Sequence, residues 1–131
     1  MLNSAAAGWR MALRVVAFQA ATVLATSVAC LMLGPDTALA VLAGGGALVL
    51  GSLLAAWGAF GGGVAGAGVA LARLLLGTAV KWAVVLAGLY LAMAVWTLPA
   101  VPVLAGAALA AAAFVVSMRF VTQRSTTRTN A

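Results

Sequence analysis

The stretch TALAVLAGGGALVLGSLLAAWGAF, residues 37–60, contains no charged side chain. An apolar run of about 20 residues is long enough to cross the hydrocarbon core of a bilayer, which is about 30 Å thick. Across all 131 residues, 66% are hydrophobic and 6% are charged, which leaves too little polar surface to cover a soluble globule. The sequence therefore predicts an integral membrane protein.

Three further apolar segments flank this one. The expected spans are residues 12–33, 37–60, 74–98 and 102–121, with the breaks at Gly34-Pro35-Asp36 and at the Pro99/Pro102 pair. Each span must satisfy its own backbone groups in lipid, and the runs lack the alternation of barrel strands, so we expect helices. The predicted fold is an all-α membrane protein, with one four-helix transmembrane domain over residues 1–131.

The connection between the second and third spans is rich in glycine. Residues 61–73, GGGVAGAGVALAR, are expected to form a cytoplasmic loop that merges into a helix from about Val69. An interfacial helix and an extension of the third span are the alternatives. The residues after the fourth span, 122–131, are expected to form a polar, basic tail.

The charges predict the orientation of the chain. The seven basic residues lie near the same ends of the four spans, at positions 10, 14, 73, 81, 119, 124 and 128. The only acidic residue, Asp36, lies at an opposite end. Because cytoplasmic loops carry an excess of Lys and Arg, both termini are expected to be cytoplasmic. The chain is expected to cross the membrane in several passes.

The N-terminal segment permits two other interpretations. Its arginines, its apolar run and the stretch Thr37-Ala38-Leu39-Ala40 resemble a signal peptide, but the run is too long for a typical signal core. Cleavage there would also place Arg73 and Arg119 on opposite sides of the membrane. The surroundings of Cys30 resemble a lipoprotein site without the expected leucine, so we interpret this cysteine as a packing residue.

Catalytic and ligand-binding residues are scarce. The chain has no histidine, and Asp36 is its only acid, so no metal cluster, carboxylate pair or Ser-His-Asp triad can form within one chain. We expect no enzyme activity, no cofactor and no metal. A proton-coupled transporter would need a carboxylate inside the membrane, and the spans offer none. The net charge of +6 comes from basic residues that we interpret as topology signals. We expect these residues to bind anionic lipid headgroups and not nucleic acid.

Small residues recur at a spacing of four in three spans. The rows are Ala17, Ala21, Ala25 and Ala29; Ala43, Ala47, Gly51, Ala55 and Ala59; and Ala79, Ala83 and Ala87. A spacing of four keeps each row on one helix face, where two backbones can approach closely. The rows either pack the four helices together or, for the second row, dock against a helix of another protein.

Two polar residues lie inside the spans. Gln19 is expected to form an interhelical hydrogen bond. Lys81 is expected a turn or two inside the third span, and two roles stay open for it. Its long stem can carry the ammonium to the headgroups, or the ammonium can meet a carboxylate on a partner.

Three stretches resemble the ATP synthase subunit I family, small membrane proteins encoded beside the subunits of the bacterial F-type ATP synthase. These are Leu13–Gln19 in the first span, Leu42–Ala47 with its glycines in the second, and Gly77–Lys81 in the third. The matching positions are Gln19, Gly45, Gly46, Gly77 and Lys81. This chain has Thr78 where the family usually has Glu, and about Gly51-Ser52 where it has Pro-Asn.

The resemblance implies an accessory protein that helps the c subunits insert and close into the membrane ring. It also implies a location in the bacterial cytoplasmic (inner) membrane, with several passes. Residues expected to bind this partner are Lys81, Gln19, Gly45, Gly46, Gly77, Ala47 and Gly51. The absent glutamate leaves Lys81 without an intramolecular partner at i−3, and it leaves no basis for a role in magnesium supply. The alternatives are a small homo-oligomeric transporter, a cation channel or a holin-like pore, and a permanently bound structural subunit.

Overall fold

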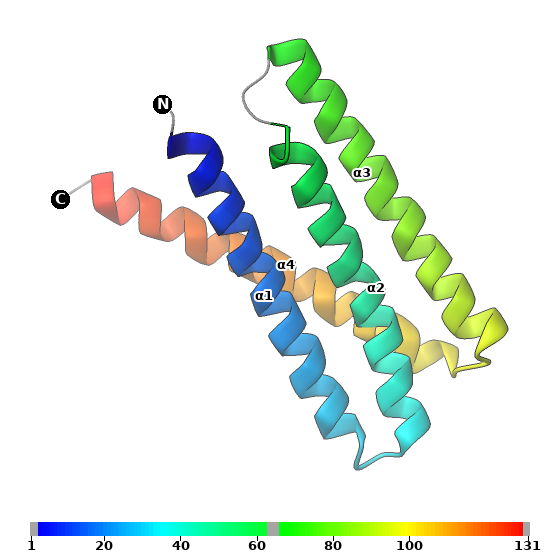
Figure 1. Ribbon diagram of the computed structural model, residues 1–131. Coiled ribbons are helices and arrows are strands. Elements are labelled where there is room, and N and C mark those ends of the chain that lie inside the picture. The colour runs from blue at the N-terminus through cyan, green and yellow to red at the C-terminus, as the bar shows by residue number, and fades with distance from the viewer. Residues whose placement is uncertain (1–2, 63–65, 130–131) are drawn as a thin grey trace.

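The computed structural model describes residues 3–62 and 66–129, and the regular structure in these ranges is helical (Figure 1). Its elements are α1 (Asn3–Cys30), α2 (Pro35–Phe60), α3 (Ala67–Tyr90), the short π-helix η1 (Leu91–Val95) and α4 (Ala100–Thr129). The segments long and apolar enough to span a membrane are Ala7–Cys30, Pro35–Phe60, Ala67–Val95 and Ala100–Arg124. The predicted all-helical fold with four candidate spans is confirmed, and it suggests a multi-pass membrane protein.

The helix α3 begins at Ala67, two residues before the start expected near Val69, so the loop expected within residues 61–73 merges into the helix slightly earlier. Gly66 is extended, with φ −59° and ψ 158°, and its carbonyl accepts the Ala70 N–H at 2.9 Å, which closes the first turn. Alanine and leucine follow, and both favour helix. Glycine therefore interrupts the helix after Phe60 but does not do so at Gly68, which lies inside α3.

The first and fourth helices are longer than their apolar runs. The first helix was expected over residues 12–33, but α1 spans Asn3–Cys30. The helix α4 continues to Thr129, through the residues expected to form a tail. The hydroxyls of Thr122 and Thr126 donate to carbonyls four residues earlier, at 2.9 and 3.1 Å, so these polar residues fit within a helix. Hydropathy marks the part of a helix inside lipid and misses the part beyond it.

The connections at the other end of the bundle are tight. Gly34 joins α1 to α2 with φ 135° and ψ 152°, a conformation that residues with a side chain rarely adopt. After α3 the helix changes from α to the wider π form in η1, and Thr97 then takes φ 50°. The third span, expected to run unbroken to Leu98, therefore ends in a π-helix and a turn.

The helix α2 is central, since it packs extensively against α1, α3 and α4. The helix α4 crosses behind α1 and α2 at a steep angle, whereas α3 lies on the other side of α2 (Figure 1). The N-terminal ends of α1 and α3 and the C-terminal ends of α2 and α4 lie toward one end of the bundle (Figure 1). We call this the basic end, and the end with the Gly34 and Thr97 turns the turn end.

The core is a thin apolar layer to which each helix contributes one side chain. Val23, Leu48, Val85 and Ala110 form this layer, one residue each from α1, α2, α3 and α4. A second cluster, made by Ala40, Ala92 and Val103, lies nearer the turn end. The side chains are small, so the helices gain contact only where their backbones approach closely.

Glycines on α2 permit this close approach. A Cβ atom at Gly44 would collide with the backbone carbonyl of Val103 in α4, and one at Gly45 would lie 2.6 Å from a methyl group of Val23 in α1. In contrast, a Cβ at Gly46 would meet nothing within 4 Å. Adjacent glycines in one run therefore have different roles.

We expect Gly44→Ala to destabilise the bundle by about 1–3 kcal/mol, because the new methyl group forces α2 away from α4. Gly46→Ala is the matched control. It should change stability by less than about 1 kcal/mol, in the stabilising direction, because alanine favours helix over glycine. Unfolding of the purified protein in mixed micelles, followed by circular dichroism, measures both. Equal destabilisation by the two variants would contradict this packing.

Candidate partner-binding site around Lys81

Lys81 lies further from the start of its helix than the sequence predicted, and its side chain is half-buried. Because α3 begins at Ala67, the residue is about 21 Å from the start of its helix at 1.5 Å per residue. It is four residues, or about one turn, from Val85 of the apolar layer. The expected position a turn or two inside the span is therefore wrong, since it assumed a shorter helix.

The stem of Lys81 passes over a glycine on the neighbouring helix. A Cβ at Gly51 of α2 would lie 3.0 Å from the Lys81 carbonyl oxygen and 3.1 Å from its Cγ. The ammonium Nζ lies 4.9 Å from the centre of the Phe114 ring in α4, which is a cation–π distance. One side chain thus starts on α3, crosses α2 and ends on α4.

The residues around Lys81 form a layer one turn nearer the basic end than the apolar layer. Gln19, Ser52, Lys81 and Phe114 each stand four residues from the apolar-layer residue of their own helix. Gln19 is fully buried, and its Nε2 donates to the Ala110 carbonyl at 2.9 Å, which confirms the expected interhelical hydrogen bond. We call these four residues the polar layer.

The polar layer contains a cation but no carboxylate. Asp36, the only acidic side chain, lies exposed in the first turn of α2 at the turn end. Thr78, at the position where the subunit I family usually has Glu, is exposed, and its hydroxyl donates to the Leu74 carbonyl at 2.8 Å. The ammonium of Lys81 therefore contacts an aromatic ring where a carboxylate would form a stronger pair.

Most of the other expected partner-binding residues pack within the bundle. Gly45 faces α1, and Gly77 of α3 faces the Ala55 carbonyl of α2 at 3.2 Å from a built Cβ. Ala47 is buried, and a Cβ atom added at Gly88 of α3 would lie 2.6 Å from the Cβ of Ala47. Of the two roles left open for the second-helix row, the contacts support packing within the bundle, because α3 and α4 already cover this face. Gly46 faces open space.

The alanine rows of the first and third spans do not pack the bundle. The side chains of Ala17, Ala21, Ala25 and Ala29 in α1 are exposed, as are those of Ala79, Ala83 and Ala87 in α3. The packed faces instead carry Val15, Gln19, Val23 and Ser27 on α1, and Gly77, Lys81 and Val85 on α3. In both helices the packed face is displaced by two residues, or about 200°, from the alanine row. The polar residue of each span marks the packed face.

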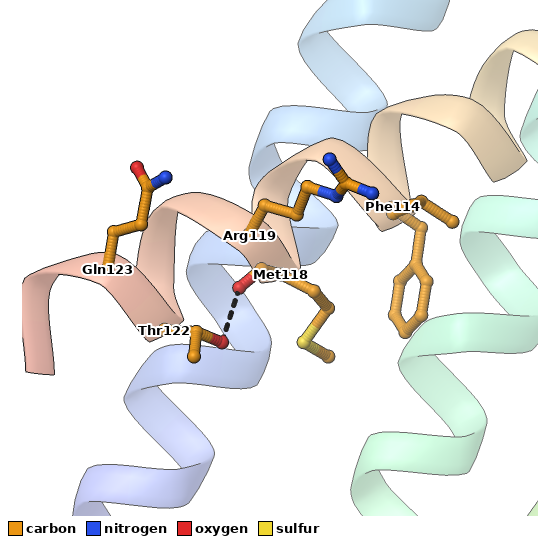
Figure 2. Close-up of a pocket in the computed structure, with 6 residues that line it drawn as sticks. Phe114, Met118, Arg119, Thr122 and Gln123 are labelled. Carbon is orange, nitrogen blue, oxygen red and sulfur yellow. Dashed lines mark hydrogen bonds between the residues drawn. The ribbon is translucent and has the colours of Figure 1, made fainter. Parts of the chain in front are cut away.

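Sequence reasoning missed a pocket along α4 that shares Phe114 with the Lys81 contact (Figure 2). It has a volume of about 440 Å³ and is lined by Phe114, Val115, Met118, Arg119, Thr122 and Gln123. In the sequence these residues mark the change from apolar to polar side chains near the end of the fourth span. That change was interpreted only as the end of a span.

The structure is a small bundle with four helices long and apolar enough to span a membrane, and one of them carries a half-buried lysine that contacts an aromatic ring. No family model, no curated protein and no solved structure matches the chain. The resemblance to the ATP synthase subunit I family thus rests on the three stretches of sequence alone.

The contact between Lys81 and Phe114 can be tested with a double-mutant cycle. We expect Lys81→Met and Phe114→Leu to show a coupling energy of about 0.5–2 kcal/mol, because each change removes the same cation–π contact. The control cycle combines Lys81→Met with Phe120→Leu, since Phe120 is exposed on the same helix. That cycle should be additive within about 0.5 kcal/mol in micellar unfolding experiments. Additivity in both cycles would exclude the contact.

Proposed function

We propose that the chain is a non-enzymatic accessory protein of the bacterial F-type ATP synthase that assists assembly of the c-subunit ring in the cytoplasmic membrane. The position of Lys81 carries the proposal: a half-buried cation about four turns inside an apolar helix contacts a ring, and Asp36, the only acidic residue of the sequence, lies at the other end of the bundle. An intramembrane cation is expensive to keep there, so it calls for a function. The three family-like stretches add independent support, and one of them contains Lys81.

The chemistry of the c subunit fits this cation. A c subunit is a helical hairpin with an essential carboxylate inside the membrane. Before the ring closes, that carboxylate faces lipid, and a nearby ammonium would stabilise its charged form. The contact with Phe114 is weaker than a charge-assisted hydrogen bond, so the ammonium can exchange the ring for the carboxylate and return. Such exchange suits a temporary chaperone.

The proposed orientation places the basic end in the cytoplasm. Arg10, Arg14, Arg73, Arg119 and Arg124 lie in the helix halves nearer this end. The positive-inside rule then puts both termini and the α2–α3 connection on the cytoplasmic side. Lys81 would lie between this surface and the bilayer centre.

The first experiment compares the yield of intact c-ring in membranes with and without the chain, at matched c-subunit expression. We expect less ring and unchanged c monomer when the chain is absent, because monomers then meet without a protecting partner. Ring bands on mild-detergent gels give the yield. An unchanged yield would refute the assembly function.

The second experiment measures binding of the c subunit to Lys81 variants. Lys81→Met should weaken binding by about three- to twentyfold, the range set by single polar contacts between membrane helices. Lys81→Arg should retain much of the binding, and Arg124→Ala, a change of an exposed arginine on α4, should leave it unchanged. Equal binding by Lys81→Met and the native protein would remove the lysine from the mechanism.

The transporter, channel or holin-like alternative makes a separate prediction. Many large apolar side chains are exposed along the described spans, and the exposed arginines lie toward the basic end, whereas a water-filled path needs a polar lining along its length. Ion or dye release from liposomes containing the purified chain should therefore equal that from protein-free liposomes. Release that rises with protein concentration would favour the pore.

A further inference from the structure

The pocket along α4 combines an apolar wall with a polar rim. Phe114, Val115 and Met118 form the wall, and Arg119, Thr122 and Gln123 follow about one turn nearer the basic end. Along the helix axis the step from Val115 to Arg119 covers about 6 Å. A ligand that fills the pocket must therefore pass from apolar to polar over a short distance.

The Arg119 side chain supplies a positive charge at the junction. In Figure 2 it runs back along α4 toward Phe114, so its guanidinium lies beside the apolar part of the pocket. Since Asp36 lies at the turn end, no acidic side chain of the chain can neutralise it. A guanidinium matches the geometry of a phosphate group, to which it can donate two hydrogen bonds.

We propose that this pocket binds an anionic phospholipid, with the headgroup phosphate on Arg119 and the start of an acyl chain against Val115 and Met118. Charge complementarity selects an anionic headgroup. The exposed apolar wall selects a lipid over free phosphate, because Val115 and Met118 are 56% and 38% exposed and offer nothing to a hydrophilic ion. The proposal is independent of the synthase, since it concerns the chain alone.

The test is native mass spectrometry of the purified full chain, titrated with phosphatidylglycerol or phosphatidylcholine. We expect phosphatidylglycerol to bind about fivefold more tightly, the effect of one cation on an anionic headgroup. Arg119→Gln should abolish this preference, and Arg119→Lys should keep part of it. Arg124→Gln is the matched control, because it removes an exposed arginine of α4 that does not line the pocket, and it should keep the preference.

The apolar half of the pocket is tested with Val115→Trp, which fills the wall and leaves Arg119 in place. This variant should weaken the binding of both lipids. Equal loss of preference in Arg119→Gln and Arg124→Gln would indicate general surface charge and overturn the proposal. Binding of glycerol phosphate as tight as that of phosphatidylglycerol would overturn the choice of a lipid. Arg119-dependent binding of a carboxylate-bearing transmembrane peptide, without lipid preference, would assign the pocket to a protein instead.

Discussion

The backbones of α2 and α4 come so close that a methyl group at Gly44 would collide with the Val103 carbonyl. In lipid this proximity matters more than side-chain hydrophobicity, because the surrounding acyl chains are as apolar as the helices. Helices held by small side chains gain van der Waals contact only at short distances. Since α2 touches all three other long helices, its surface residues determine how the whole bundle packs.

The position of Lys81 depends on the same close packing. Its stem can cross α2 because Gly51 has no side chain there. Its ammonium then reaches the Phe114 ring on α4. The apolar layer lies one turn beneath it, and Gln19 ties α1 to α4 at the same level. The cation is thus held by the packing of three helices and not by an ion pair within the chain.

The sequence was sufficient for the fold class because hydropathy and charge act over whole spans. It predicted four helices and the limits of α2 closely, since Pro35 and the glycines at 61 and 62 interrupt the helix sharply. It failed at the outer ends of α1 and α4, which continue past their apolar runs, because leaving an apolar environment does not end a helix. It also chose the wrong faces of α1 and α3. Alanine rows show where close packing is possible, whereas Gln19 and Lys81 show where burial actually occurs, because a polar group in lipid needs a protein partner.

The residue roles were harder to predict than the elements. Gly45 and Gly46 look equivalent in the sequence, yet one contacts Val23 and the other faces open space. Helix rotation decides this difference, and rotation depends on contacts between residues far apart in the chain. The pairing of Lys81 with Phe114 has the same origin, since it needs the steep crossing of α4 over α2.

That crossing also gives the molecule an uneven outline. The helix α4 starts beside the end of α3 and departs from it toward the basic end, so the bundle is broader there than at the turn end (Figure 1). In a bilayer such a wedge displaces more lipid from one leaflet than from the other. The lateral pressure of the two leaflets then acts on it unequally, and the curvature of the surrounding membrane becomes one of the forces that set the angle of α4.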